Sequence, residues 1–163
     1  MASGDAYDVF ISYSRSDSNV AADLNGWLGD QGFSTFFDRS ALRPGLRWVP
    51  ALEEAIGRAR AVAILVGPHR IGNTQQYERE LALVRQTGDP AFPVIPVLMP
   101  GCDAPPTGFL QLLTWVDLSK GNTVREQAGG LEALRGALRG ETVAVSAVCC
   151  AYTICIIILK GIT

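Results

Sequence analysis

The segment from Tyr7 to Asp17 is the feature that most restricts how this chain can fold. A short run rich in aromatic and β-branched residues ends abruptly in polar residues, and a helical pattern begins directly after them. This order is typical of the first strand of an open α/β sheet. Such sheets bind ligands outside the carboxyl ends of their strands, beside the position where the strand order reverses. We therefore expect Tyr13, Ser14 and Arg15 to lie on a ligand-binding rim.

The rest of the chain continues this alternation of strand and helix. Apolar residues recur at helical spacing in some segments and form short continuous runs in others, which is typical of helices and buried strands respectively. Pro93 and Pro96 place one of the strands near an edge or a bulge. The alternation with short connections predicts an α/β fold, a doubly wound sheet of five parallel strands with right-handed crossovers. The predicted helices lie at about 18–28, 48–59, 74–86 and 131–138, and the strands after the first at about 33–37, 61–66, 92–99 and 114–118.

The composition changes near the end of the chain. We assign residues 5–140 to one domain and residues 141–163 to an apolar tail, in which Ser146 and Thr153 are the only residues between Val143 and Leu159 that are not apolar. This run approaches the minimum length of a helix that spans a bilayer, so membrane attachment is one interpretation. A strand or a truncated junction is the alternative. Because five strands are already assigned, we expect the tail to lie outside the folded domain.

Charge and cysteine content exclude several classes of function. A formal net charge of −2 with scattered arginines gives no electrostatic reason to expect a nucleic-acid partner. No Cys-x-x-Cys pair occurs and His69 is the only histidine, so we predict no metal site and no disulfide framework. The polar start of the chain lacks a cleavable secretory signal, and we expect a reducing, cytoplasmic location. The cysteines are Cys102, Cys149, Cys150 and Cys155.

Four segments carry a resemblance to a known family. They are Asp8–Ser14, Phe37–Gly45 with Trp48, Ala61–Pro68 and Val94–Gly101. In their order and spacing they resemble the Toll/interleukin-1 receptor (TIR) domains, and bacterial members in particular, over about residues 5–140. The resemblance implies a flavodoxin-like fold with five parallel strands and association between copies of the domain. In many bacterial and plant members it also implies cleavage of NAD at the bond between nicotinamide and ribose.

The catalytic residue of this family is a glutamate near the start of the third helix, usually four residues after a tryptophan. Alignment of Leu81 and the residues that follow it with bacterial members puts Glu78 in the catalytic place and Thr74 where the tryptophan belongs. Counting back from the apolar residue that usually follows the acid selects Glu80 instead. Two positions apart on a helix, the two carboxylates point in different directions, so only one of them faces a pocket. We prefer Glu78.

The chemistry that the resemblance implies requires few groups. Loss of neutral nicotinamide leaves positive charge on the ribose, which a carboxylate stabilises. An aromatic face from Tyr13 or Trp48 would hold the nicotinamide, and Arg15 would hold a phosphate, with Ser14 and Asp38 completing the pocket. No Gly-x-Gly-x-x-Gly follows the first strand, so NAD+ is expected as a substrate that is cleaved and not as a cofactor for hydride transfer.

The loop between Asp38 and Trp48 corresponds to the segment through which TIR domains contact one another. Its expected contact residues are Leu42, Arg43, Pro44, Gly45 and Leu46. The first interpretation is therefore an NAD+ hydrolase that is activated by self-assembly in bacterial defence or signalling. The alternative is a module without catalysis that signals through contacts between TIR domains. A flavodoxin-like receiver or flavin domain is a weaker third interpretation, because the first strand lacks an acidic pair and its loop lacks a phosphate-binding Ser/Thr/Gly run.

Overall fold

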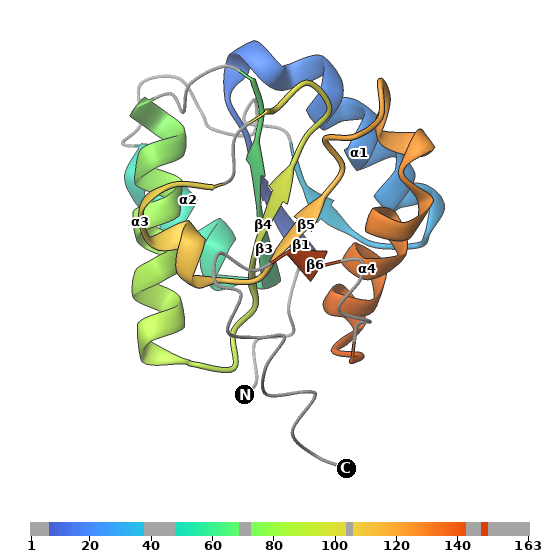
Figure 1. Cartoon of the computed structure of the whole chain (residues 1–163). Coiled ribbons are helices and arrows are strands. Elements are labelled where there is room, and N and C mark those ends of the chain that lie inside the picture. Colours follow the sequence, from blue (N-terminus) through green and yellow to red (C-terminus); the bar gives the residue numbers. More distant parts are fainter. Residues whose placement is uncertain (1–6, 38–47, 69–72, 104–105, 143–147, 150–163) are drawn as a thin grey trace, which may run out of the picture.

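The computed structural model describes residues 7–37, 48–68, 73–103, 106–142 and 148–149. Strands and helices alternate along these residues, as the sequence pattern predicts (Figure 1). The strands are β1 (Tyr7–Ser12), β2 (Thr35–Phe36), β3 (Ala59–Val66), β4 (Val94–Leu98), β5 (Trp115–Asp117) and β6 (Val148–Cys149). The helices are α1 (Ser18–Asp30), α2 (Trp48–Gly57), α3 (Asn73–Gly88) and α4 (Ala128–Arg139), with short 3-10 helices η1 (Arg15–Asp17), η3 (Gly108–Leu112) and η4 (Val124–Glu126).

The strands form one sheet in the order β2-β1-β3-β4-β5-β6. All pairs from β2 to β5 are parallel, and only β6 runs antiparallel to its neighbour. In the central pair, Tyr7 lies opposite Ala59 and Ser12 opposite Ile64, so the carboxyl ends of β1 and β3 lie side by side. The order 2-1-3-4-5 is that of flavodoxin-like folds. The predicted doubly wound sheet of five parallel strands is therefore confirmed.

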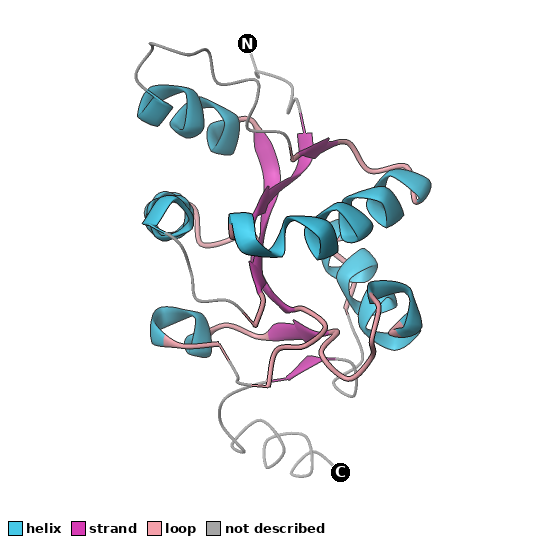
Figure 2. Cartoon of the chain, turned by 90° about the horizontal axis from the view of Figure 1, so that it is seen from above, coloured by secondary structure: helices cyan, strands magenta, loops and turns pink. Residues whose placement is uncertain are grey.

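Helices cover both faces of the sheet (Figures 1 and 2). The pairs α1 with α4 and α2 with α3 lie on opposite faces, and each pair closes over its own apolar cluster. Alternate residues of β1 serve the two clusters. Val9 and Ile11 pack on the face of α1 and α4, whereas Phe10 packs with Leu52 of α2 and Ala82 of α3. Burial on both faces explains why the central strands are apolar without interruption.

Strand β4 departs from expectation because it has a neighbouring strand on both sides, so Pro96 does not lie in an edge strand. Pro96 pairs with Ile64 of β3, and β5 pairs with β4 only from Val97 onward. The carbonyl of Leu98 accepts a hydrogen bond from the Leu118 N–H on the β5 side. Pro96 lies two residues before Leu98, so its backbone nitrogen points to the same side of β4. This position precedes the first residue pair between β4 and β5. The sheet therefore does not require the N–H that proline lacks.

The apolar tail also departs from expectation, because two of its residues join the sheet. Val148 lies opposite Val116 and Cys149 opposite Trp115, which makes β6 an antiparallel sixth strand. The expectation that the tail has no place in the sheet is wrong for these two residues, and the domain boundary at residue 140 stays a prediction. The remainder of the tail lies outside the described residues. Among the helices that the structure describes, none has the length and hydrophobicity needed to cross a bilayer.

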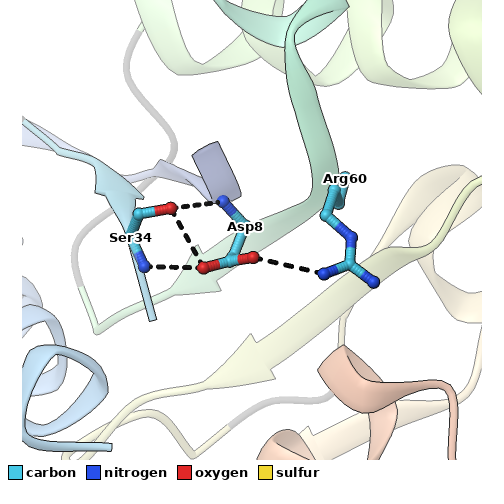
Figure 3. A network of polar contacts seen from close by, with 3 residues as sticks. All are labelled: Asp8, Ser34 and Arg60. Carbon is cyan, nitrogen blue, oxygen red and sulfur yellow. Dashed lines mark hydrogen bonds and ion pairs between the residues drawn. The ribbon is translucent and has the colours of Figure 1, made fainter. Parts of the chain in front are cut away.

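A polar network joins the amino ends of the first three strands (Figure 3). The Asp8 N–H donates to Ser34 Oγ at 3.0 Å, and the Ser34 N–H and hydroxyl donate to Asp8 Oδ2 at 2.8 and 3.0 Å. Arg60 of β3 donates from Nη1 to Asp8 Oδ1 at 3.3 Å. Ser34 directly precedes β2, so this network ties β2 and β3 to the central strand β1 at the edge opposite the carboxyl ends.

Candidate functional site

The candidate site lies where the strand order reverses, between β1 and β3. From β1 the chain first builds β2 on one side of the strand and then returns to build β3 on the other side. In open α/β sheets this reversal opens a position for ligands outside the carboxyl ends of the two strands. Ser12 ends β1 and Val66 ends β3 at this edge.

Helix α3 contributes two buried polar side chains to this edge. Gln75 is 2% exposed and Glu78 is 1% exposed, and their spacing of three residues places them on the same face of the helix. The Gln75 side-chain amide donates from Nε2 to the carbonyl of Leu65 at 2.7 Å and to that of Ser12 at 3.4 Å. One amide therefore ties the first turn of α3 to the carboxyl ends of both strands.

Glu78 reaches the end of β1 from the next turn of α3. The Ser12 hydroxyl, which is fully buried, donates a hydrogen bond to Glu78 Oε2 at 2.6 Å. This length lies within the usual range of an O–H···O hydrogen bond. Glu80 lies on a different face of the helix and is exposed, where its charge acts on Arg79. Burial lowers the pKa of the Arg79 guanidinium, and Glu80 partly opposes that effect.

A second carboxylate packs against the same edge. Asp17, the last residue of η1, is buried, and its N–H donates to the Ser14 carbonyl at 2.9 Å. A Cβ added to Gly67, the residue after β3, would lie 2.3 Å from Asp17 Oδ2. Asp17 directly precedes α1 but makes no side-chain cap on that helix. The carboxylate instead fits against the backbone that leaves β3.

The buried polar side chains of the described residues all gather at this edge. They are Ser12, Ser14, Asp17, Gln75 and Glu78. A polar group away from water is costly unless it is hydrogen-bonded, so the concentration of these groups at one edge makes that edge the candidate functional site. In the described ranges, no group of three or more His, Cys, Asp or Glu side chains is arranged to hold a metal ion.

The structure brings some of the residues predicted from the sequence to this edge. Tyr13 directly follows β1, and its ring stacks on Phe37 with centroids 4.8 Å apart and an interplanar angle of 16°. Ser14 is buried next to it, and Arg15 is exposed at the start of η1. Trp48 is the first residue of α2. The predicted residues Asp38, Leu42, Arg43, Pro44, Gly45 and Leu46 lie outside the described residues.

Ser12 and Gln75 are site residues that sequence reasoning missed. Gln75, Glu78 and Ala82 are all buried on α3, so the side of the helix that faces the sheet begins with two polar residues. That pattern was readable in the sequence as polar residues at positions i and i+3, followed by a small apolar residue at i+7. Ser12 carried no comparable signal, because its partner Glu78 lies 66 residues away in the chain.

Comparison with protein families gives one match over most of the chain. The sequence profile of the TIR domain family matches residues 9–134, which run from within β1 to the middle of α4. Comparison with curated proteins gives no match.

Solved structures with the same fold are also TIR domains. The TIR domain of the Toll-related receptor TRR-2 from Hydra magnipapillata has a TM-score of 0.65 at 23% identity, over 82% of this chain and 99% of that chain. The TIR-STING receptor of C. gigas in complex with 2',3'-cGAMP has a TM-score of 0.58 at 21% identity, over 77% and 39%. The TIR domains of the activated Roq1 resistosome have a TM-score of 0.50 at 25% identity, over 57% of each chain.

Proposed function

Since this chain belongs to the TIR domain family, we propose that it is an NAD+ hydrolase that is activated by self-assembly. The observation that supports this proposal most is the Glu78 carboxylate. It lies at the carboxyl end of β1, beside the reversal of strand order, and it accepts a short hydrogen bond from Ser12. Of the two glutamates considered from the sequence, Glu80 is exposed on another face of α3, which favours Glu78 as the catalytic group.

The proposed reaction breaks the bond between the ribose carbon and the nicotinamide nitrogen. Nicotinamide leaves with the electron pair of that bond as a neutral base, and positive charge develops on the ribose. The Glu78 carboxylate stabilises this charge through space and binds the sugar hydroxyls. Water then adds to the ribose carbon and a proton is released. Arg15, exposed beside this edge, is the proposed phosphate contact, and Tyr13, Ser14, Asp38 and Trp48 are proposed to shape the rest of the pocket.

The burial of Glu78 supports a requirement for activation. A catalytic carboxylate must touch the ribose, yet Glu78 is 1% exposed in the single chain. Substrate therefore reaches it only after the surrounding chain moves. We propose that contacts between copies through the loop from residue 38 to residue 48 drive this change, so that turnover rises more steeply than in proportion to protein concentration.

A second candidate function is a TIR interaction module that does not cleave NAD+. The same burial favours it, because a covered carboxylate bonded to Ser12 also serves as an internal tie between α3 and β1. The position expected to hold a tryptophan is occupied by Thr74, which also favours this alternative. Under this function, copies associate and transmit a signal through their contacts alone.

The test measures loss of NAD+ by the purified full chain, with and without a crowding or clustering agent. We expect Glu78→Gln to lower the rate by about 10² to 10³-fold, since it removes one charge-stabilising group. The matched control is Glu80→Gln, which removes an exposed carboxylate of the same helix and is expected to keep the parental rate. A clustered parent without turnover favours the interaction module, and a loss confined to Glu80→Gln moves the catalytic assignment by two residues.

A further inference from the structure

The polar contacts around Glu78 form an anchor with two parts. Gln75 fixes the first turn of α3 to the carbonyls of Leu65 and Ser12, at the ends of β3 and β1. The hydroxyl of Ser12 then binds one oxygen of Glu78, in the following turn of the helix. Both parts rest on backbone in the middle of the sheet, where β1 has neighbours on both sides.

We propose that Ser12 and Gln75 are positioning residues that hold the Glu78 carboxylate in the orientation needed for cleavage of NAD+. This inference rests on the proposed function. Neither residue touches the substrate. Gln75 fixes the position of α3 relative to the ends of the strands. Ser12 fixes the rotation of the Glu78 carboxylate through its hydrogen bond to Oε2.

The chemistry of the three side chains supports a positioning role. An apolar residue at position 75 or 78 would fill the same space without the cost of burying an amide or a carboxylate. Glutamate has several rotatable bonds, and a group that stabilises developing charge must be held in place before the reaction to be effective. A fully buried hydroxyl on a central strand is a rigid donor, because strands on both sides hold its backbone in place.

The chain contains a matched control for the bond between Ser12 and Glu78. At the end of β5, Ser119 Oγ donates to Asp117 Oδ1 at 2.6 Å, which is the same chemistry at the same length. Strands β3 and β4 separate β5 from β1. Ser119→Ala therefore removes a hydroxyl–carboxylate hydrogen bond of the same length from the same edge of the sheet, away from Glu78, at a part-buried position where the bond joins residues two apart in the chain.

The experiment compares steady-state NAD+ cleavage by the clustered full chain in four single variants, Ser12→Ala, Gln75→Leu, Glu78→Gln and Ser119→Ala, and in the double variant that combines Ser12→Ala with Glu78→Gln. Misplacement of a catalytic group by about 1 Å commonly costs up to 10²-fold, so we expect Ser12→Ala and Gln75→Leu to lower kcat by about 10- to 100-fold with KM nearly unchanged. Ser119→Ala keeps the parental kcat. In the Glu78→Gln background, Ser12→Ala has little further effect, because Ser12 acts through Glu78.

The inference is overturned if Ser12→Ala leaves kcat unchanged. It is also overturned if Ser12→Ala lowers kcat by the same factor in the parent and in the Glu78→Gln background. Ser12→Cys keeps the branching of the side chain, with a somewhat larger atom that is a weaker donor, and it answers the same question where the alanine variant does not fold. A crystal structure of Ser12→Ala gives a readout that does not depend on activity. We expect the Glu78 side chain to leave the end of β1 or to adopt several rotamers. If the clustered parent cleaves no NAD+, the proposed function fails. If the Glu78 side chain keeps its position in the crystal structure of Ser12→Ala, the positioning role of Ser12 is refuted whatever the activity.

Discussion

On the scale of a single residue, Gly67 shows how closely the chain packs at the candidate site. Its role is to leave space, because the Asp17 carboxylate occupies the volume that any side chain would need. An added Cβ would lie 2.3 Å from Oδ2 and 2.4 Å from Cγ of Asp17. Asp17 has a short and buried side chain, so it cannot swing out of the way as the end of a lysine would.

Gly67→Ala is therefore expected to lower the free energy of unfolding by about 1–3 kcal/mol, the usual cost of overpacking a filled interior. The measurement is urea denaturation of the full chain. The control is Gly26→Ala in the exposed middle of α1, where an added Cβ meets nothing within 4 Å. That change should raise the free energy of unfolding by about 0.5–1 kcal/mol, because alanine favours a helix over glycine. Equal effects of the two substitutions would contradict the close contact with Asp17.

On the scale of elements, the first three strands are held at both ends by polar contacts of different kinds. Gln75 ties the carboxyl ends of β1 and β3, and the network of Asp8, Ser34 and Arg60 ties the amino ends of β1, β2 and β3 (Figure 3). Burial raises the pKa of Asp8, but hydrogen bonds from Ser34 and the charge and hydrogen bond of Arg60 outweigh it, so the pKa lies below its ordinary value of 3.8.

Asp8→Asn should destabilise the sheet in a manner that depends on pH. The pKa of Asp8 is lower in the folded chain than in the unfolded chain, so the contribution to stability is fully present above 3.8 and is lost as the pH falls through the folded-state pKa. We expect a cost of about 1–2 kcal/mol in the free energy of unfolding at pH 7. The difference from the parent should shrink below pH 3.8 in urea titrations at stepped pH.

The control for this prediction is Asp30→Asn. Asp30 pairs with Arg125 at 2.8 Å, but both side chains are 60% exposed. Exposed ion pairs contribute about 0–1 kcal/mol, so this variant should remain close to the parent in the same titrations. If Asp8→Asn lowers the free energy of unfolding by the same amount down to the lowest pH, the charge of the carboxylate is not what stabilises the strand ends.

On the scale of the whole molecule, β6 brings a distant part of the chain back to the sheet. Val148 and Cys149 cover the outer side of β5, a strand of only three residues. We expect truncation after Thr142 to lower the free energy of unfolding by about 1 kcal/mol, through the loss of two cross-strand pairs. Truncation after Cys149 keeps both pairs and is the control. Thermal melts that do not distinguish the two truncations would restore the expectation that the tail adds nothing to the domain.

The elements of this fold could be predicted from the sequence because their signals are local. Each signal lies within a short stretch of the sequence: the helical spacing of apolar residues in α1 and α4, and the continuous apolar runs in β1 and β3. The structure confirms these helices and strands. The anchor at Ser12, Gln75 and Glu78 could not be predicted in the same way. Its contacts depend on which strands become neighbours, and the pairing of Val148 with Val116 depends on the same long-range choice. Pro96 misled the prediction because its position in the sheet depends on where β5 begins.

The two outer strands of the described sheet limit how copies of this molecule can join. Strands β2 and β6 are each two residues long, so each offers very little backbone for pairing with another chain. Long free edges are what allow sheets to extend from one molecule into the next. Within the described residues the sheet edges therefore offer few positions for pairing, and we expect copies of this domain to meet through their helices and loops. Under the proposed function, each copy in such an assembly keeps its own set of strand ends, so the number of NAD+ sites would grow with every copy added.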